Sequence, residues 1–112
     1  MFTVKSSSSI ISNYAFIDCG TIIMNNVVIN VDVKIGKNCI INTNALIEHD
    51  VIVGDHCHIS TGVILNGSVK VGNNCFIGSG SIIREGVIIG DRSIISAGKI
   101  VMNNLPEDSI LK

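Results

Sequence analysis

The three histidines of the chain lie within ten residues of one another, at His49, His56 and His58, and Asp50 directly follows the first of them. Neutral imidazole titrates near physiological pH, so a histidine supported by a carboxylate can remove a proton from an attacking amine or hydroxyl. Asp32, closer to the N-terminus, is a second carboxylate that could tune the same site. The sequence indicates general-base chemistry at His49, although a His-Asp dipeptide alone is also typical of a solvated corner.

The four cysteines offer a second possible chemistry, metal ligation. They contain no CxxC pair, and three of them, Cys39, Cys57 and Cys75, recur at equal intervals along the chain. A structural repeat explains such regular spacing better than a metal site does. We therefore predict reduced, structural cysteines and no bound metal. Cys19 is more than one coil away from His49 and is not expected to act as a nucleophile with it.

A repeat of six residues runs through the chain and must position these side chains. An aliphatic residue stands at every sixth position in sixteen consecutive hexads, which is far beyond chance. The sixteen residues are Ile11, Ile17, Ile23, Ile29, Ile35, Ile41, Ile47, Val53, Ile59, Leu65, Val71, Ile77, Ile83, Ile89, Ile95 and Val101. The fifth position of each hexad is small or β-branched except at Lys99 and Leu105.

A period of six is three times the strand period and does not fit an α-helix, so each hexad is predicted to be one short strand and a corner. The motif Ile-Gly-x-x-Cys and its variants recur in every third hexad, from Ile35 to Ser93, so three hexads make one triangular coil. First and fifth positions point inward, which places Cys39, Cys57 and Cys75 inside. We predict an all-β, parallel β-helix of about five coils. Glycines after the aliphatic residues are expected where corners need backbone freedom and no bulky side chain. These are Gly36, Gly54, Gly72, Gly78 and Gly90.

Composition excludes several classes of function. The formal net charge is −1, from 8 basic and 9 acidic residues spread along the chain, which gives no electrostatic footprint for nucleic acid or an anionic membrane. Every apolar stretch is too short to cross a bilayer, and the segment Met1–Ile11 lacks the apolar centre of a signal peptide. We expect a cytoplasmic protein that acts on a small molecule.

The segments Ile41–Asp50 and Val53–Ser60 resemble the hexapeptide-repeat family, in its sugar O- and N-acetyltransferase branch. That branch includes the sialic acid O-acetyltransferases and the UDP-4-amino-sugar acetyltransferases. The resemblance implies a left-handed β-helix, a homotrimer with active sites between subunits, and acetyl-CoA as cosubstrate. It implies that His49 is the general base supported by Asp50, and that Asn42 and His58 contact the acceptor or the acetyl group. His56 is given no role and is expected on the surface.

Gly67 is the candidate donor for the oxyanion that forms on the thioester. It lies three hexads, or one coil, after His49 and should stack directly on it, and the resemblance assigns it the same place near the thioester. The resemblance also puts Ser79 and Ala97 beside the pantetheine arm of the cofactor, which runs between subunits. We predict transfer of an acetyl group to the 4-amino group of a nucleotide-linked sugar by direct attack.

The predicted organisation is an N-terminal lead-in at residues 1–10, the acetyltransferase β-helix at residues 11–106 and a tail at residues 107–112. Related enzymes usually carry an N-terminal domain that binds the nucleotide-sugar, for which the lead-in leaves no room, so the chain is either an excised domain or a short form. Three alternatives stay open: a sialic acid or other sugar O-acetyltransferase, a non-catalytic β-helix scaffold, and a zinc enzyme like the γ-class carbonic anhydrases. The spacing of the histidines argues against the zinc enzyme.

Overall fold

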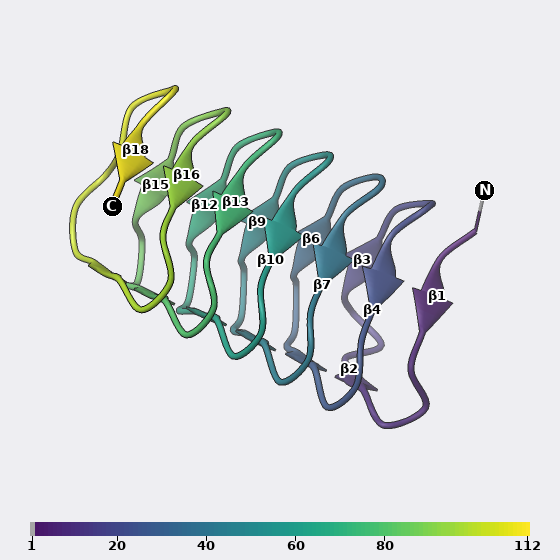
Figure 1. Ribbon diagram of the computed structural model, residues 1–112. Helices are drawn as coiled ribbons and strands as arrows, with labels where there is room; N and C mark the ends of the chain where they lie inside the picture. Colours follow the sequence, from purple (N-terminus) through teal and green to yellow (C-terminus); the bar gives the residue numbers. More distant parts are fainter. Residues whose placement is uncertain (1) are drawn as a thin grey trace.

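The computed structural model describes residues 2–112 and shows a triangular prism of stacked coils (Figure 1). Eighteen strands of two residues each make three parallel sheets of seven, six and five strands, and residues 2–112 contain no helix. Sheet A contains β1 (Val4–Lys5), β4 (Ile22–Ile23), β7 (Ile40–Ile41), β10 (His58–Ile59), β13 (Phe76–Ile77), β16 (Ile94–Ile95) and β18 (Ile110–Leu111). Sheet B contains β2 (Ile10–Ile11), β5 (Val28–Ile29), β8 (Leu46–Ile47), β11 (Ile64–Leu65), β14 (Ile82–Ile83) and β17 (Ile100–Val101). Sheet C contains β3 (Phe16–Ile17), β6 (Lys34–Ile35), β9 (Ile52–Val53), β12 (Lys70–Val71) and β15 (Ile88–Ile89).

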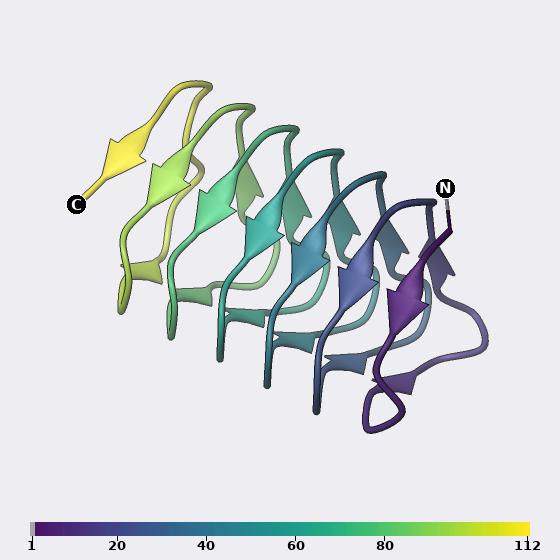
Figure 2. The ribbon, with the colours of Figure 1, turned by 45° about the vertical axis from the view of Figure 1, so that its right-hand side comes forward.

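The chain visits sheets A, B and C in turn and then rises by one coil (Figure 2). Leu46 pairs with Ile64, and Ile64 with Ile82, so equivalent residues in successive coils are three hexads apart, as the repeat predicts. Backbone hydrogen bonds run between coils, for example from Leu46 N to Val63 O at 2.9 Å. We name the three edges after the sheets that they join: the A–B edge, the B–C edge and the C–A edge.

The core is the column of first and fifth hexad positions, as the sequence predicts. Ile41, Ile47 and Ile59 are fully buried, and so are the fifth-position residues Ala45 and Val63. Burying one such aliphatic side chain contributes about 1.5–3 kcal/mol, which is the main gain that offsets the ordering of so many short strands. The prism measures 33 × 22 × 21 Å. In a stack of coils each core residue packs against its own coil and the adjacent ones.

The fourth hexad position, and not the second, is where the corners require unusual backbone. Among residues 2–112, fifteen have positive φ, ten of them non-glycine, including Asp50 (62°) and His56 (59°). Gly36, Gly54 and Gly72, at second positions, are not among them. A Cβ on each of these glycines would collide with the side chain of Asp55, Asn73 or Asp91 in the next coil. The prediction that these corners need backbone freedom is therefore wrong, whereas the prediction that they exclude a bulky side chain is correct.

The coils extend beyond the sixteen aliphatic hexads. The sequence predicts about five coils, but the strands β1 and β18 extend the stack to about six, so the predicted number is too small. The last coil is shorter than the others: Ile94 pairs with Ile110, earlier in the chain than the strict repeat would place its partner, and Leu105 forms a bridge with Ile89. A strict count of six residues therefore does not predict β18 at Ile110–Leu111. The expected lead-in at residues 1–10 starts with Met1, which lies outside the described residues.

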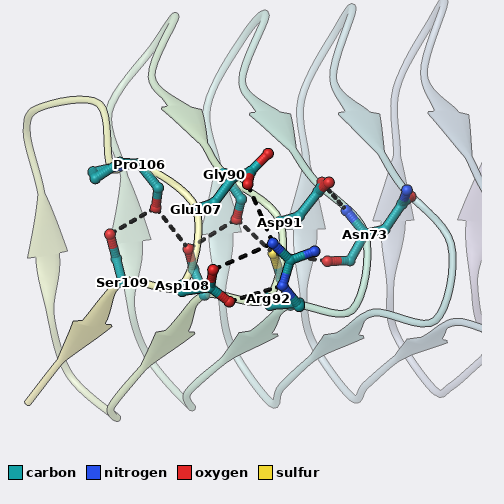
Figure 3. A network of polar contacts seen from close by, with 10 residues as sticks. Asn73, Gly90, Asp91, Arg92, Pro106, Glu107, Asp108 and Ser109 are labelled. Atoms are coloured by element: carbon teal, nitrogen blue, oxygen red, sulfur yellow. Dashed lines mark hydrogen bonds and ion pairs between the residues drawn. The ribbon is translucent and has the colours of Figure 1, made fainter.

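Polar contacts pin the shortened coil to the rest of the prism at the C–A edge (Figure 3). Arg92 Nε donates to Asp108 Oδ1 at 2.8 Å, and Arg92 Nη2 lies 3.2 Å from Glu107 Oε2. The Arg92 guanidinium lowers the pKa of the Asp108 carboxyl below its ordinary value. These groups are exposed, so solvent and salt screen the ion pairs.

Candidate active site

His49 and Asp50 form a side-chain pair at the B–C edge, directly after β8. Neighbours on a regular strand point to opposite faces, but Asp50 has φ 62°, which turns its side chain back toward the imidazole. His49 Nδ1 lies 3.0 Å from Asp50 Oδ2, and the two side chains are 51% and 55% exposed. The side chains of His49 and Asp50 are therefore in direct contact.

Gly67 lies beneath the imidazole of His49, one coil further along the chain. A Cβ at position 67 would stand 2.5 Å from His49 Nε2 and 2.6 Å from Cε1, so any side chain there would displace the imidazole. The stacking of Gly67 on His49 that the repeat predicts is confirmed. A shallow depression of about 240 Å³ opens at this point, lined by Glu48, His49, Asn66, Gly67 and Glu85.

The side chains around the imidazole are acidic, and their negative charge favours the protonated form of His49. The hydrogen bond to Asp50 raises the pKa of His49 above its ordinary value, and the charges of Glu85 and Glu48 add to the effect. Glu85 stands two coils from His49 in the same column, with only Gly67 between them. Asp32, which the sequence offered as the tuning charge, is not among the groups that shift this pKa. Glu85 was not predicted from the sequence as part of this site, although it lies six hexads after His49.

The remaining predicted residues lie elsewhere on the prism, on sheet A and the A–B edge. His58, on the outer face of β10, approaches Asn42, with 3.4 Å between His58 Nε2 and Asn42 Nδ2. The His58 ring also packs edge-on against Phe76, with ring centroids 5.3 Å apart. Ser79 and Ala97 follow in successive coils of the same edge, where Gly98 N donates to Ser79 O at 2.8 Å.

The structure thus divides the predicted site into two groups. His49, Asp50 and Gly67 share the B–C edge, whereas Asn42, Ser79 and Ala97 share the A–B edge and His58 lies beside them. The width of sheet B separates the two groups within one prism. Counting hexads in threes would have revealed this separation from the sequence, because consecutive hexads always turn at different edges.

The other candidates for chemistry lie apart from both groups. His56 is exposed at the C–A edge, and Cys19 lies on that same edge, away from His49. Cys39, Cys57 and Cys75 are buried, and their thiols donate to the carbonyl oxygens of Gly54, Gly72 and Gly90 at 3.1, 2.9 and 3.2 Å. Among residues 2–112, no three His, Cys, Asp or Glu side chains converge as metal ligands would.

A larger hollow of about 700 Å³ is the open N-terminal end of the prism, lined by residues from Lys5 to Ile17. It contains none of the predicted site residues. In residues 2–112 we find no apolar helix of the length that crossing a membrane requires.

These observations define a class of structure, a parallel β-helix of hexapeptide coils with a His-Asp pair on one edge. Two family models match consecutive segments: bacterial transferase hexapeptide over residues 32–67, and hexapeptide repeat of succinyl-transferase over residues 68–102. Together the matches run without a gap from residue 32 to residue 102, which is more than half of the 112 residues. The chain belongs to the hexapeptide-repeat family, as the sequence resemblance predicts. No curated protein sequence gives a significant match.

Solved structures share the whole coil. A mutant of the GDP-perosamine N-acetyl transferase from Caulobacter crescentus, in complex with CoA and GDP-perosamine, is 34% identical over 98% of this chain and 52% of its own, with a TM-score of 0.97. The acetyltransferase domain of PglB from Neisseria gonorrhoeae FA1090, in complex with acetyl coenzyme A, is 25% identical over 96% of this chain and 53% of its own, with a TM-score of 0.95. WeeI from Acinetobacter baumannii AYE shares the fold at 24% identity over 97% of this chain and 54% of its own, with a TM-score of 0.93. The chain spans about half the length of these proteins.

Proposed function

We propose that this chain transfers an acetyl group from acetyl-CoA to an amino sugar. The acceptor group is the 4-amino group of a nucleotide-linked sugar. The observation that carries the proposal is the contact of His49 with Asp50 on one side and with the depression above Gly67 on the other. The similar Caulobacter enzyme was crystallised with CoA and GDP-perosamine, and the Neisseria domain with acetyl coenzyme A, which supports this pair of substrates.

The proposed mechanism starts from the neutral imidazole. Asp50 accepts a hydrogen bond from the Nδ1–H of His49, so the lone pair of Nε2 faces the depression. The amine nitrogen attacks the thioester carbonyl carbon while Nε2 removes the amine proton. The tetrahedral oxyanion is stabilised by the backbone N–H of Gly67, which has no hydrogen-bond partner in residues 2–112. Collapse breaks the C–S bond, and His49 returns the proton to the CoA thiolate.

A homotrimer with sites between subunits is part of the proposal. The B–C edge and the A–B edge of one prism cannot meet, so His49 and His58 act together only if edges of different copies adjoin. The outer face of sheet B is a column of aliphatic residues that suits association: Ile10, Val28, Leu46, Ile64, Ile82 and Ile100. The outer column of sheet C is interrupted by the exposed Lys34 and Lys70, which suits contact with water.

In this arrangement Asn42 and His58 contact the acceptor or the acetyl group, and Ser79 and Ala97 lie along the pantetheine arm. Residues 11–106 make the catalytic unit. A cytoplasmic location belongs to the same proposal, because that is where bacterial acetyl-CoA is made and used.

The first experiment is calorimetric titration of the purified protein with acetyl-CoA, followed by turnover with a nucleotide-linked 4-amino sugar. We expect binding in the micromolar range, and His49→Ala to abolish turnover. His56→Ala is the matched control, because His56 is equally at a corner but on the C–A edge, and it should leave turnover unchanged. Absence of acetyl-CoA binding would contradict the proposal and favour a structural β-helix, whereas turnover of a hydroxyl acceptor alone would make the chain an O-acetyltransferase.

A further inference from the structure

The backbone N–H at the third position of a hexad lies outside the strand hydrogen bonds, and some corners cap it with a side chain in one of two ways. In the first, the residue just before it turns its side-chain oxygen back onto the N–H. Three corners use this arrangement: Asp18 to Cys19 N at 2.7 Å, Asn30 to Val31 N at 3.0 Å, and Asn42 to Thr43 N at 2.7 Å. An Asp or Asn at the second position is therefore a ready-made cap for the following N–H.

In the second arrangement the cap comes from the next coil, along the C–A edge. Asp55, Asn73 and Asp91 each accept from the third-position N–H one coil before them, at 2.8 Å in every case (Figure 3 shows the last of these). Their side chains cross the space above Gly36, Gly54 and Gly72, where a Cβ would collide with them. This cap therefore requires a glycine at the second position.

Gly67 has neither cap. Glu85 stands at the third position of the next coil and makes no hydrogen bond to the Gly67 N–H, and Asn66 does not bend onto it. The Asn66 amide turns away: Asn66 Nδ2 donates to Ile83 O at 2.9 Å, and the Asn66 backbone N donates to the same oxygen at 3.2 Å. Asn30 and Asn42 carry the same side chain at the same hexad position but bend onto the N–H that follows.

The uncapped N–H is placed where a ligand is needed. Other third-position residues without a cap, such as Asn25 and Thr61, are exposed to water. Gly67 is instead buried beneath the His49 imidazole and lines the depression, whereas a buried backbone N–H in proteins is almost always paired. An N–H kept free beside a general base is suited to the carbonyl oxygen of an acyl group.

We infer that Asn66 is a positioning residue, whose hydrogen bond to Ile83 O keeps the Gly67 N–H free for the thioester carbonyl of acetyl-CoA. Asn66 itself contacts neither reacting atom. The inference rests on the proposed function and adds a residue to it. When Asn66 bonds to Ile83 O, the Gly67 N–H is available to the oxyanion; if the side chain bonded to the Gly67 N–H, it would not be.

The test compares Asn66→Asp with Asn66→Ala. A carboxylate cannot donate to Ile83 O, so in Asn66→Asp the side chain bends onto the Gly67 N–H, as Asp18 does at Cys19. Alanine can neither donate nor cap, and it leaves the N–H free. Affinities for acetyl-CoA and for CoA, which lacks the carbonyl, are measured for each protein by calorimetry. The added charge of Asn66→Asp affects both ligands alike, so the ratio of the two affinities isolates the carbonyl contact.

We expect the wild type to prefer acetyl-CoA over CoA about fivefold, the value of one ordinary hydrogen bond. The preference should persist in Asn66→Ala and fall to about one in Asn66→Asp. An unchanged preference in Asn66→Asp, or an equal loss in both variants, overturns the inference. If the wild type binds neither ligand, the proposed function fails instead.

A measurement on the ligand-free wild type tests the inference separately and does not depend on any variant folding. The amide proton of Gly67 should show the steep temperature coefficient of an unbonded N–H in NMR spectra. The amide protons of Val31 and Thr43, which are capped, should show shallow coefficients. A shallow coefficient at Gly67 would overturn the inference, because the N–H would then already be bonded.

Discussion

The imidazole of His49 lies directly over the backbone of Gly67, so close that a single methyl group at position 67 would stand 2.5 Å from His49 Nε2. The pair joins two adjacent coils at the B–C edge, where Ser68 N also donates to His49 O at 2.9 Å. The proposed general base and the proposed oxyanion donor are thus held at a fixed separation by the same hydrogen bonds that stack the coils.

Gly67→Ala tests this close approach. The new Cβ forces the imidazole away from the depression, so we expect acetyl-CoA to bind about tenfold more weakly, a loss of about 1.4 kcal/mol. Gly86→Asn is the matched control on the same edge: Gly86 has φ 75°, which asparagine tolerates, and a Cβ there meets nothing within 4 Å. Calorimetry on both variants decides the matter, and equal binding by Gly67→Ala and wild type would argue against a ligand at this place.

The pH dependence follows from the carboxylates around His49. Asp50 raises the pKa of the imidazole, so the neutral base forms only at higher pH and the rate should rise as pH increases through that raised pKa. Asp50→Asn should move the rate profile and the NMR titration of His49 to lower pH. Glu85→Gln should do the same to a smaller extent. A titration of His49 that does not move in Asp50→Asn would show that the contact is not maintained in solution.

The same ion pair links stability to pH with a definite sign. Because the folded-state pKa of His49 is raised, the pair stabilises the fold below the ordinary histidine pKa and loses this effect as pH rises through the raised value. The thermal midpoint of the wild type should therefore fall slightly across this window. The midpoint of Asp50→Asn should not, and a parallel decline in both proteins would assign the effect to other groups.

The buried thiol column predicts a specific preference at position 57. The Cys57 thiol donates to Gly72 O at 2.9 Å, and the Thr21 hydroxyl makes the equivalent bond to Gly36 O. Cys57→Thr should retain the bond, whereas Cys57→Val, of the same shape, should lower the free energy of unfolding by about 1 kcal/mol. Urea denaturation of the two variants gives the comparison, and equal stability would mean that the donor is unimportant.

Cysteine reactivity provides an independent check of the same column. Cys39, Cys57 and Cys75 are buried, and each of their thiols donates to a backbone carbonyl oxygen. Cys19 is only partly buried. Alkylation of the native protein should therefore label Cys19 and spare the three column cysteines, and all four should react in urea. Mass spectrometry counts the labels, and rapid native labelling of Cys57 would contradict the packing.

The anchor of the shortened coil can be tested with Arg92→Ala. Loss of the contacts to Glu107 and Asp108 should speed amide hydrogen exchange in β18 and leave the thermal midpoint almost unchanged, because exposed ion pairs contribute little. Since the pKa of Asp108 is lowered, the anchor should weaken in the wild type as pH falls through that lowered value. Arg84→Ala is the control, because the Arg84 side chain donates to Met102 O and does not contact Glu107 or Asp108. Unchanged exchange in β18 would show that the backbone hydrogen bonds to β16 and the packing of Leu111 hold the coil without Arg92.

The sequence by itself determined the coil, because a linear period is enough to specify it. The strict sixfold spacing of aliphatic residues defines which positions face inward, and the echo in every third hexad defines which residues stack, so His49 over Gly67 and the buried position of Cys57 could be predicted. The resemblance of the His49 segment to sugar acetyltransferases supplied the chemistry.

The tertiary structure decided what a period does not encode. The C-terminal coil closes early, because Leu105 replaces the sixfold position in packing on Ile89. The charge of Glu85, two coils from His49, is among those that raise the pKa of the imidazole, and the charge of Asp32 is not. The Asn66 side chain has two nearby groups to which it could bond, Ile83 O and the Gly67 N–H, and it bonds to Ile83 O. Such a choice depends on the three-dimensional surroundings of each corner, and identical asparagines at Asn30 and Asn42 resolve it the other way.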